Sequence, residues 1–542
     1  MKYDLIIKNG FIVDGSGNPG FYGDVGIKNG KIIKVGSTVS GDADKIIDAE
    51  GNLVSPGFID PHVHEELIVL NDNKFEVFLK QGVTTIISGN CGHSITPYSS
   101  SNIYEYMYKN GLIAQETVEK YNRDNPKWNN FSEYADCVTR KGTNINMGFL
   151  LGHGTIRWSV MGGSKDRKPT LEEGKEIERL VREGMEQGAF GISTGLSYIP
   201  SRYADTEELI EVAKIIKEYD GIYASHIRYY LGVKEAVKEA IKIGQESGVR
   251  VQVSHLTPTV PEAFDLILEA RNNKVEIAAD TIPRSTGHCT RKDRLIQFIM
   301  ATSSKLFDLG IEGVKAALKT EEGRKEIMKD ESLFGEDKSN IIIINTDNPE
   351  LENRSVKDIA AEKGIDSDDL VLDLLADDND NITFWLGGPV RGDFPYKTHE
   401  KNILDNPLVM VGSDTIFGEV DDPYAWYELQ RRGAFPIFFN MYLEGDIKIE
   451  EIVKRVTSLP AQQFRIKNKG LLTEGKDADI SIINIGKYYY PNPDEIDYKD
   501  PLKTADGVEY VIVNGKIALN KGKVLESYPG KVILKNEEEI KI

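Results

Sequence analysis

The chain has 542 residues, of which 40% are hydrophobic and 28% are charged, a composition typical of a globular protein with one large domain or a few ordinary ones. Its 86 acidic and 66 basic residues give a formal net charge of −20, which argues against nucleic acid or an anionic membrane as a partner. The sequence contains no apolar run long enough to predict a membrane span, and charges near the first residue predict no export signal. Three cysteines are too few for a disulfide framework, so we expect a cytoplasmic protein.

Short β-type segments occupy both ends of the chain. Residues 4–55 consist of such runs, with Asn-Gly and Gly-rich turns between them. Short β-type segments of the same kind occur near the other end, for example Val508–Val513. We therefore predict one small β-sandwich domain built from both termini, residues 1–55 and 467–542.

Between these ends, strand-like runs alternate with helix-like runs such as Leu171–Gln187, which is the pattern of βα units around a parallel sheet. The candidate strands are Val54–Ile59, Thr84–Ser88, Asn146–Leu151, Ala189–Ile192, Ile222–Ser225, Val249–Val253, Glu276–Ala279 and Leu408–Val411. Eight strands of this kind predict an α/β fold in which residues 56–466 form a TIM-like (β/α)₈ barrel.

Polar side chains follow these strands, and the active site of such a barrel lies at the carboxyl ends of its strands. The residues at these ends are His62, His64, Cys91, His153, His226, His255, Asp280 and Asp414. Five of the chain's eight histidines are in this set. Imidazole and thiolate are preferred ligands of zinc, so the set predicts a metal site.

Each of these residues also has an ordinary explanation. His153 is typical of a loop residue that bonds to the backbone, Asp414 could cap the next helix, and Cys91 could be a small buried hydrophobic side chain. His62 and His64 together are stronger evidence for a metal site, because side chains two residues apart in an extended segment point to the same side.

The motifs around these residues resemble those of amidohydrolase-superfamily enzymes of the N-acyl-D-amino-acid deacylase (D-aminoacylase) group, in order and over essentially the full length. The matching segments are Gly57–His64, Gly82–Thr85, Gly89–Gly92, Gly191–Tyr198, Ser225–Arg228, Val253–Leu256, Val411–Asp414, Thr457–Ala461, Lys469–Gly475 and Ala478-Asp479. The Asn-Cys-Gly element distinguishes this group from relatives that use a carboxylated lysine between two metals. The resemblance implies a metallo-dependent hydrolase barrel.

The resemblance also implies two metal positions. One tight zinc site would consist of Cys91, His226 and His255, and a second position, weaker or empty, of His62, His64 and Asp414. A bound metal lowers the pKa of water toward ~7. Asp414 would take a proton from the attacking water and return it to the leaving nitrogen. Tyr198 is a candidate substrate or oxyanion donor, and equally a packing tyrosine.

The sequence departs from this family where a carboxylate would bind. His255 is followed by Leu-Thr257 where Leu-Lys is usual, and Asp280 by Thr-Ile-Pro-Arg284 where the family has x-Tyr-Pro-Tyr. The usual residues hold the free carboxylate of an N-acyl amino acid through charge-assisted bonds.

Three readings of the departure remain open. In the first, Arg228, Arg284 or Arg431 supplies the carboxylate contact, and the enzyme deacylates an N-acyl-D-amino acid. In the second, the substrate is a neutral N-acyl amine, a dipeptide-like amide or a cyclic amide, as in hydantoinase or dihydroorotase chemistry. The third is a non-catalytic scaffold, which is disfavoured because no candidate metal ligand is lost. In the first two cases the protein is an enzyme whose partner is a small-molecule amide. The sequence leaves the oligomeric state undecided.

Residues 285–340 interrupt the barrel pattern with charged, helix-like segments. The candidate helices are Asp293–Met300, Ile311–Leu318 and Thr320–Asp330. The segment resembles the small insertion that acts as a lid in this family, and lids close over substrate to exclude water. The alternative is a surface excursion with no catalytic part.

Overall fold

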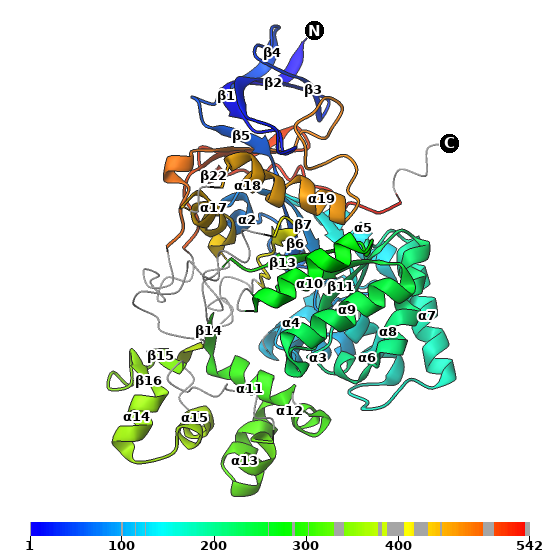
Figure 1. Cartoon of the computed structure of the whole chain (residues 1–542), viewed down its shortest axis with the longest axis vertical. Helices are drawn as coiled ribbons and strands as arrows, with labels where there is room; N and C mark the ends of the chain where they lie inside the picture. The colour runs from blue at the N-terminus through cyan, green and yellow to red at the C-terminus, as the bar shows by residue number, and fades with distance from the viewer. Residues whose placement is uncertain are drawn as a thin grey trace.

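The structure is a computed structural model that describes residues 2–98, 101–113, 115–124, 126–257, 260–283, 288–301, 303–329, 341–377, 382–386, 406–416, 432–444, 447–491 and 503–536. Its elements form a central parallel barrel, a β-sheet at one end and a separate unit at the other (Figure 1). None of the helices in these ranges is both long enough and apolar enough to cross a membrane.

The barrel wall consists of two parallel sheets. One contains β6 (Phe58–Val63), β7 (Val83–Ser88) and β8 (Asn146–Phe149). The other contains β9 (Leu151–Gly152), β10 (Gly191–Gly195), β11 (Ile222–His226), β12 (Arg250–Val253), β13 (Ile277–Thr281) and β18 (Val409–Val411). Only Leu150 separates β8 from β9, so these two together form one strand of the barrel. A parallel bridge between Val63 and Thr415 joins the first and last strands of the wall. The described residues thus confirm the predicted (β/α)₈ barrel.

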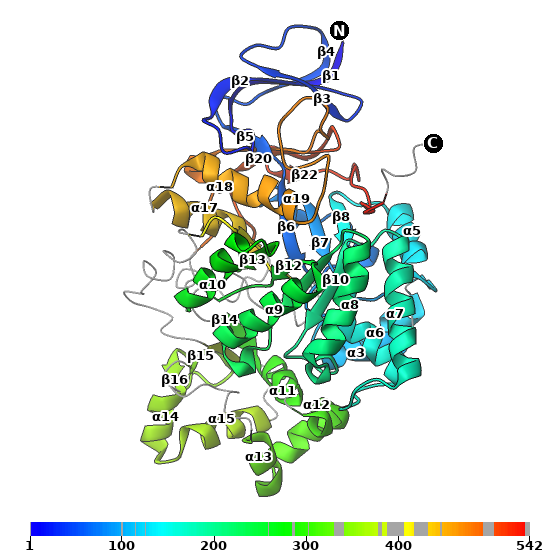
Figure 2. The same ribbon diagram turned by 45° about the vertical axis from the view of Figure 1, so that its right-hand side comes forward.

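Helices cover the outside of this wall, and Figure 2 shows several of them side by side. The described helices outside the insertion are α1 (Ile68–Asn71), α2 (Glu76–Leu79), α3 (Ser101–Lys109), α4 (Gln115–Asp124), α5 (Phe131–Lys141), α6 (His153–Met161), α7 (Leu171–Glu186), α8 (Thr206–Glu218), α9 (Val233–Ser247), α10 (Pro261–Asn272), α17 (Ala434–Glu444), α18 (Ile449–Val456) and α19 (Ser458–Gln463). The helix predicted from Leu171 is α7, which starts with a capping box between Thr170 and Glu173. Its buried Ile177, Leu180, Val181 and Met185 recur at helical spacing and face the barrel.

Strands from both ends of the chain form one sheet. The strands are β1 (Tyr3–Ile12), β2 (Phe21–Lys28), β3 (Lys31–Gly36), β4 (Ala43–Asp48), β5 (Leu53–Pro56), β19 (Ile480–Ile483), β20 (Val508–Val513), β21 (Lys516–Asn520) and β22 (Lys523–Val524). Within the described residues this sheet has nine strands, and the antiparallel pair β5–β19 joins its two halves. Apolar side chains from both halves share one core, for example Ile7, Ile27, Ile482 and Ile512.

The predicted strand Val54–Ile59 is wrong, because this stretch contains the end of β5 and the start of β6. The chain passes from one sheet to the other at Gly57, where a Cβ atom would overlap the Thr84 side chain. Only a glycine allows β6 to approach its neighbour this closely. One consequence is that His62 lies inside β6, not past the end of the strand.

Between β13 and β18 the chain leaves the barrel and forms an α+β unit. Its elements are β14 (His288–Arg291), α11 (Lys292–Met300), α12 (Ser304–Leu318), α13 (Glu321–Ile327), β15 (Ile341–Asn345), β16 (Arg354–Ser355), α14 (Val356–Lys363), α15 (Ser367–Ala376) and β17 (Thr383–Leu386). The three predicted helices correspond to α11, α12 and α13. The excursion extends beyond the predicted end at residue 340, because β15, β16 and β17 pair with one another and with β14, not with the barrel.

Part of this unit is fixed to the barrel by polar and aromatic contacts. Arg294 donates to the carbonyl of Asn110 over 2.7 Å, and Gln297 donates to that of Tyr108 over 3.1 Å. From α12, the Phe307 ring packs edge-on against Trp158, with ring centroids 5.9 Å apart. Helices α11 and α12 are therefore docked on the end of α3, on the residue that follows it and on α6.

A buried ion pair connects the barrel to the sheet of both ends. The Lys469 ammonium lies 2.5 Å from an Asp479 oxygen and 3.1 Å from one of Asp477. Asp479 also accepts from the side chain of Asn146 on β8 and from the backbone N–H of Asn514. Burial lowers the pKa of Lys469, but Asp479 and Asp477 outweigh it, so the net pKa is raised.

Removing this cation should destabilise the fold. We expect Lys469→Met to lower the free energy of unfolding by about 3–5 kcal/mol, because two carboxylates lose their buried partner. Lys175→Met is the matched control: Lys175 pairs with Glu172 on the solvent face of α7, where such pairs contribute about 0–1 kcal/mol. Denaturant unfolding of both variants measures the difference, and equal effects would contradict a structural role for the buried pair.

Candidate metal centre

The strand ends of the barrel bring six of the predicted residues to one place. His62 lies in β6, with His64 just after it, and Cys91 follows β7. His226 ends β11, His255 follows β12 and Asp414 follows β18. Two sets of these residues have ligand atoms that all lie within 4.8 Å of one another.

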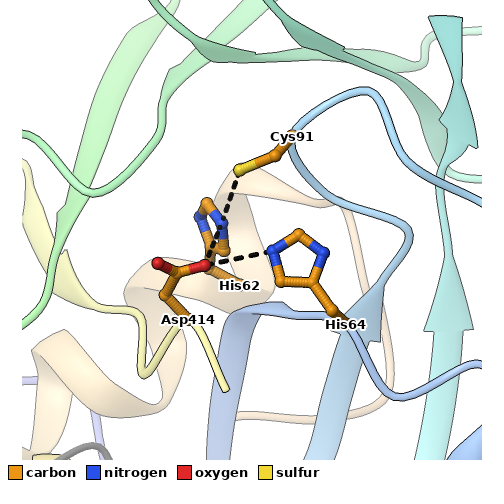
Figure 3. A group of neighbouring side chains, drawn as sticks. All are labelled: His62, His64, Cys91 and Asp414. Carbon is orange, nitrogen blue, oxygen red and sulfur yellow. Dashed lines mark hydrogen bonds and ion pairs between the residues drawn. The ribbon is translucent and has the colours of Figure 1, made fainter. Parts of the chain in front are cut away.

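The first set, which we call the His62 group, consists of His62, His64, Cys91 and Asp414. Figure 3 shows the four side chains pointing toward a common point. One Asp414 oxygen lies 3.0 Å from His64 Nε2 and 3.3 Å from His62 Nε2. The Cys91 Sγ lies 3.3 Å from the same His62 nitrogen.

The second set, the His226 group, consists of Cys91, His226 and His255. The Cys91 Sγ lies 3.4 Å from His255 Nε2, which is 2.8 Å from His226 Nδ1. Cys91 thus belongs to both groups, and its sulfur lies between the two sets of nitrogen and oxygen donors.

The backbone is left-handed at three residues of these groups. The φ angles are 52° at Cys91, 35° at His255 and 54° at Asp414. This conformation costs an ordinary residue about 1–3 kcal/mol and concentrates at functional sites. The nearby Gly412 has no Cβ, which would lie 2.6 Å from an Asp280 oxygen and 2.7 Å from the His62 Cβ.

Asp280 contacts one residue of each group, His62 and His255, and helps to fix their orientation. Its Oδ1 lies 3.1 Å from His62 Nδ1 and accepts from the backbone N–H of His255 over 2.7 Å, while Gln252 donates to Oδ2. Burial opposes ionisation, but His62 and Gln252 hold the pKa of Asp280 below its usual value. A carboxylate on Nδ1 leaves His62 Nε2 directed at Cys91 and Asp414, as outer partners of metal-binding histidines do.

The donor set fits a soft divalent cation. The Cys91 thiol is 3% exposed, and burial raises its pKa to about 11, so without a cation the thiol keeps its proton at neutral pH. Burial lowers the pKa of His62, but the Asp280 carboxylate outweighs it and the net pKa is raised. Sulfur and imidazole nitrogen at carboxyl ends of a barrel are ligands that zinc takes. The residues present therefore fit a zinc ion.

The predicted substrate residues have different surroundings. The Tyr198 ring lies beside the groups, with its centroid 4.6 Å from that of His226. The Arg228 guanidinium is bound to protein atoms: it pairs with Glu239 at 2.9 Å and donates to the carbonyls of Arg202 and Ala204. Arg284 and Arg431 lie outside the described residues.

Two further histidines at the rim differ from each other. His153 is apart from the groups, since its ring nitrogens contact Ser201 at 3.0 Å and Glu208 at 3.1 Å. His93, which the sequence motifs do not single out, lies beside the His62 group, with its ring centroid 6.3 Å from that of His64. Its position two residues after Cys91, in the same strand-end turn, is a signal that could have identified it.

Known proteins resemble this chain over its whole length. D-aminoacylase from Alcaligenes xylosoxydans xylosoxydans is 28% identical over 542 residues, covering 98% of this chain and 97% of the relative. N-acyl-D-aspartate deacylase from the same organism is 26% identical, covering 98% and 95%.

Solved structures also match. A crystal structure of D-aminoacylase has a TM-score of 0.74 at 25% identity, and covers 98% of this chain and 100% of its own. N-acyl-D-glutamate deacylase from Bordetella bronchiseptica, in complex with zinc and a phosphonate inhibitor, has a TM-score of 0.72 at 25% identity and the same coverage.

The family model for amidohydrolases, Amidohydro_3, matches residues 45–291 and 354–519. The unmatched stretch between them contains α11, α12, α13 and β15 of the insertion. Since the match spans most of the chain, this protein belongs to the amidohydrolase family and is a hydrolase of C–N amide bonds.

Proposed function

We propose that this enzyme deacylates an N-acyl-D-amino acid to a carboxylate and a free D-amino acid, with zinc as its cofactor. The observation that carries the proposal is Cys91, whose thiol lies between two groups of metal-ligand side chains in a chain with full-length similarity to D-aminoacylase. The buried free thiols of Cys91 and Cys137 support a reducing cytoplasm as its location.

We assign the tight zinc site to Cys91, His226 and His255. Three protein ligands are the usual number in a catalytic zinc site, which keeps one position for water or substrate. His62, His64 and Asp414 would mark a second, weaker position that shares Cys91. When bound, zinc lowers the pKa of water toward about 7 and polarises a carbonyl.

Asp414 is the proposed general base and general acid. Its Oδ1 lies within 3.3 Å of two imidazole nitrogens, at the carboxyl end of the barrel where the amide would bind. The carboxylate would accept a proton from the attacking water and pass it to the leaving nitrogen. We assign Tyr198 to the substrate, because its ring borders His226 at the same end.

A second candidate is hydrolysis of a neutral or cyclic amide by the same residues. Two observations favour it. Thr257, not lysine, follows His255-Leu256, and the Arg228 guanidinium is already bound to Glu239 and to backbone carbonyls. Neither residue therefore offers an obvious partner for a free carboxylate, and of the cations proposed for that role, Arg284 and Arg431 lie outside the described residues.

A matched substrate panel separates the two candidates. We expect the zinc-loaded enzyme to release amine from N-acetyl-D-amino acids at least about tenfold faster, in kcat/KM, than from their L-enantiomers or D-carboxamides, a difference of about 1.4 kcal/mol in transition-state binding. Cleavage of only the carboxamides or of cyclic amides would instead support the second candidate.

Removing Cys91 should affect both metal groups. We expect Cys91→Ala to lower bound zinc below one equivalent and activity by more than the 10–100-fold typical of a supporting residue. Cys137→Ala is the matched control, since Cys137 is also a buried free thiol but lies on α5. Full metal content and activity in Cys91→Ala would contradict the assignment.

Zinc binding should also release a proton from Cys91. With a pKa of about 11 the thiol is protonated at pH 7.5, and a zinc ligand must be a thiolate. In a weakly buffered titration with zinc, the wild type should release about one proton more than Cys91→Ala. Equal proton release would show that Cys91 does not bind the ion.

Replacing Asp414 should affect proton transfer more than metal binding. We expect Asp414→Asn to lower kcat about 10²–10⁴-fold, because the amide cannot accept the proton of water. Zinc bound by Cys91, His226 and His255 should remain at about one equivalent. The measurement is kcat together with metal content, and an unchanged kcat would rule out the proposed role.

A further inference from the structure

A pocket of about 140 Å³ lies at the amino end of the barrel. Its lining includes Asn146, the first residue of β8, and Phe190, which directly precedes β10. The two metal-ligand groups lie toward the carboxyl ends of the strands, so this pocket is at the opposite end of the barrel. The proposed hydrolysis makes no use of it.

Two segments form the walls of this pocket, residues 465–469 after α19 and residues 531–535 near the C-terminus. The second segment is fixed to the barrel, because the backbone N–H of Ile533 donates to the carbonyl of Met147 over 2.8 Å. In the first, Arg465 has a left-handed backbone with φ of 57°, at a helix end where glycine is usual. The side chains on both walls therefore start from defined backbone positions.

The walls are rich in positive charge, although the whole chain has a formal net charge of −20. Among the described residues that line the pocket, Asp477 is the one acidic residue. The basic residues of the lining are Arg465, Lys467, Lys469, Lys531 and Lys535. Lys469 is already neutralised by Asp477 and Asp479, as described above.

Behind one wall, three cations share two carboxylates. Arg250 lies closest to both, at 2.9 Å from Asp220 and 3.0 Å from Glu276. Arg465 and Lys535 approach the Asp220 Oδ2 only to 3.8 and 3.5 Å, and Arg465 lies 3.4 Å from Glu276. Two negative charges cannot neutralise three positive ones, so one positive charge at this wall has no counterpart among these residues.

Two lysines of the C-terminal segment add to this excess. The Lys531 side chain is exposed and forms no ion pair in the part of the chain that the structure describes. Burial lowers the pKa of Lys535, and the nearby Arg250 and Arg465 lower it further, so it stays below its usual value despite Asp220. An anion in the pocket would relieve this repulsion.

We propose that this pocket binds a phosphate group, with Arg465, Lys531 and Lys535 as its ligands. A phosphate group carries a charge of about −1.5 to −2 at pH 7, which matches the shared cation and Lys531 together. A guanidinium presents paired N–H groups that suit phosphate oxygens, and lysines contribute mobile point charges. The site is separate from the proposed hydrolysis and requires no metal.

Binding of inorganic phosphate to the full-length protein tests the site. At pH 7.5 and constant ionic strength, we expect calorimetry to show saturable binding of about one equivalent, and phosphate to raise the Tm more than chloride does. Lys531→Glu should weaken binding at least about tenfold, because a repulsive charge replaces an attractive one. Lys45→Glu is the matched control, since Lys45 is an exposed lysine on β4 outside the pocket and the change in net charge is the same.

Two further ligands identify what the pocket recognises. Tighter binding of glycerol 3-phosphate than of inorganic phosphate would assign the site to a phosphomonoester, and the reverse order to the free ion. Malonate carries a similar charge without phosphate geometry and should bind at least about tenfold more weakly. Equal binding of malonate and phosphate would contradict a phosphate site.

Three other results would overturn the proposal. The first is no difference between phosphate and chloride at equal ionic strength, and the second is equal phosphate binding by Lys531→Glu and Lys45→Glu. The third concerns Glu537, Glu538 and Glu539, which lie outside the described residues. If phosphate binds only after all three are replaced by glutamine, the acidic end of the chain is the occupant. None of these measurements depends on amide hydrolysis, so they stand or fall separately from the proposed function.

Discussion

The contacts of the Cys91 sulfur with His62 on one side and His255 on the other join two halves of the barrel rim. His62 comes from β6 and His255 from the segment after β12, so the two rings reach the same thiol from two separate strands of the wall. At this point residue 91 has a left-handed backbone, with φ of 52°. This one side chain thus belongs to both candidate ligand groups and connects the turn after β7 with β6 and with the segment after β12.

Backbone strain at the strand ends is offset by buried hydrogen bonds nearby. Cys91, His255 and Asp414 all have positive φ angles, and such conformations persist only where the surrounding structure determines them. Asp280 supplies part of that determination, because a single carboxylate binds the His62 ring and the backbone N–H of His255 together. Buried hydrogen bonds from Asp280 therefore help to hold these candidate site residues in place.

The periodic features of the sequence predicted the barrel and the residues at its rim, because strands, their carboxyl ends and the residue types found there follow local rules. Features that depend on contacts between distant segments could not be predicted from the sequence. The break at Gly57 depends on the approach of Thr84, and the ion pair of Arg228 depends on Glu239 in α9. The end of the insertion depends on the pairing of β15 with β17. His93 was passed over because only Tyr106 and Tyr198, which come from other elements, give it a defined place.

The pairing of β5 with β19 has a consequence for synthesis of the chain. Val54 pairs with Ile482, which is translated more than four hundred residues later. The N-terminal half of the nine-stranded sheet described above therefore has no partner strand until then. At about 5–20 residues per second this delay is roughly 20–90 s. During that time β5 has an unpaired, apolar edge, a place where other chains can add a strand. The barrel also closes late, at Val63 and Thr415, so the nascent protein spends most of its synthesis with open sheet edges that chaperones can recognise.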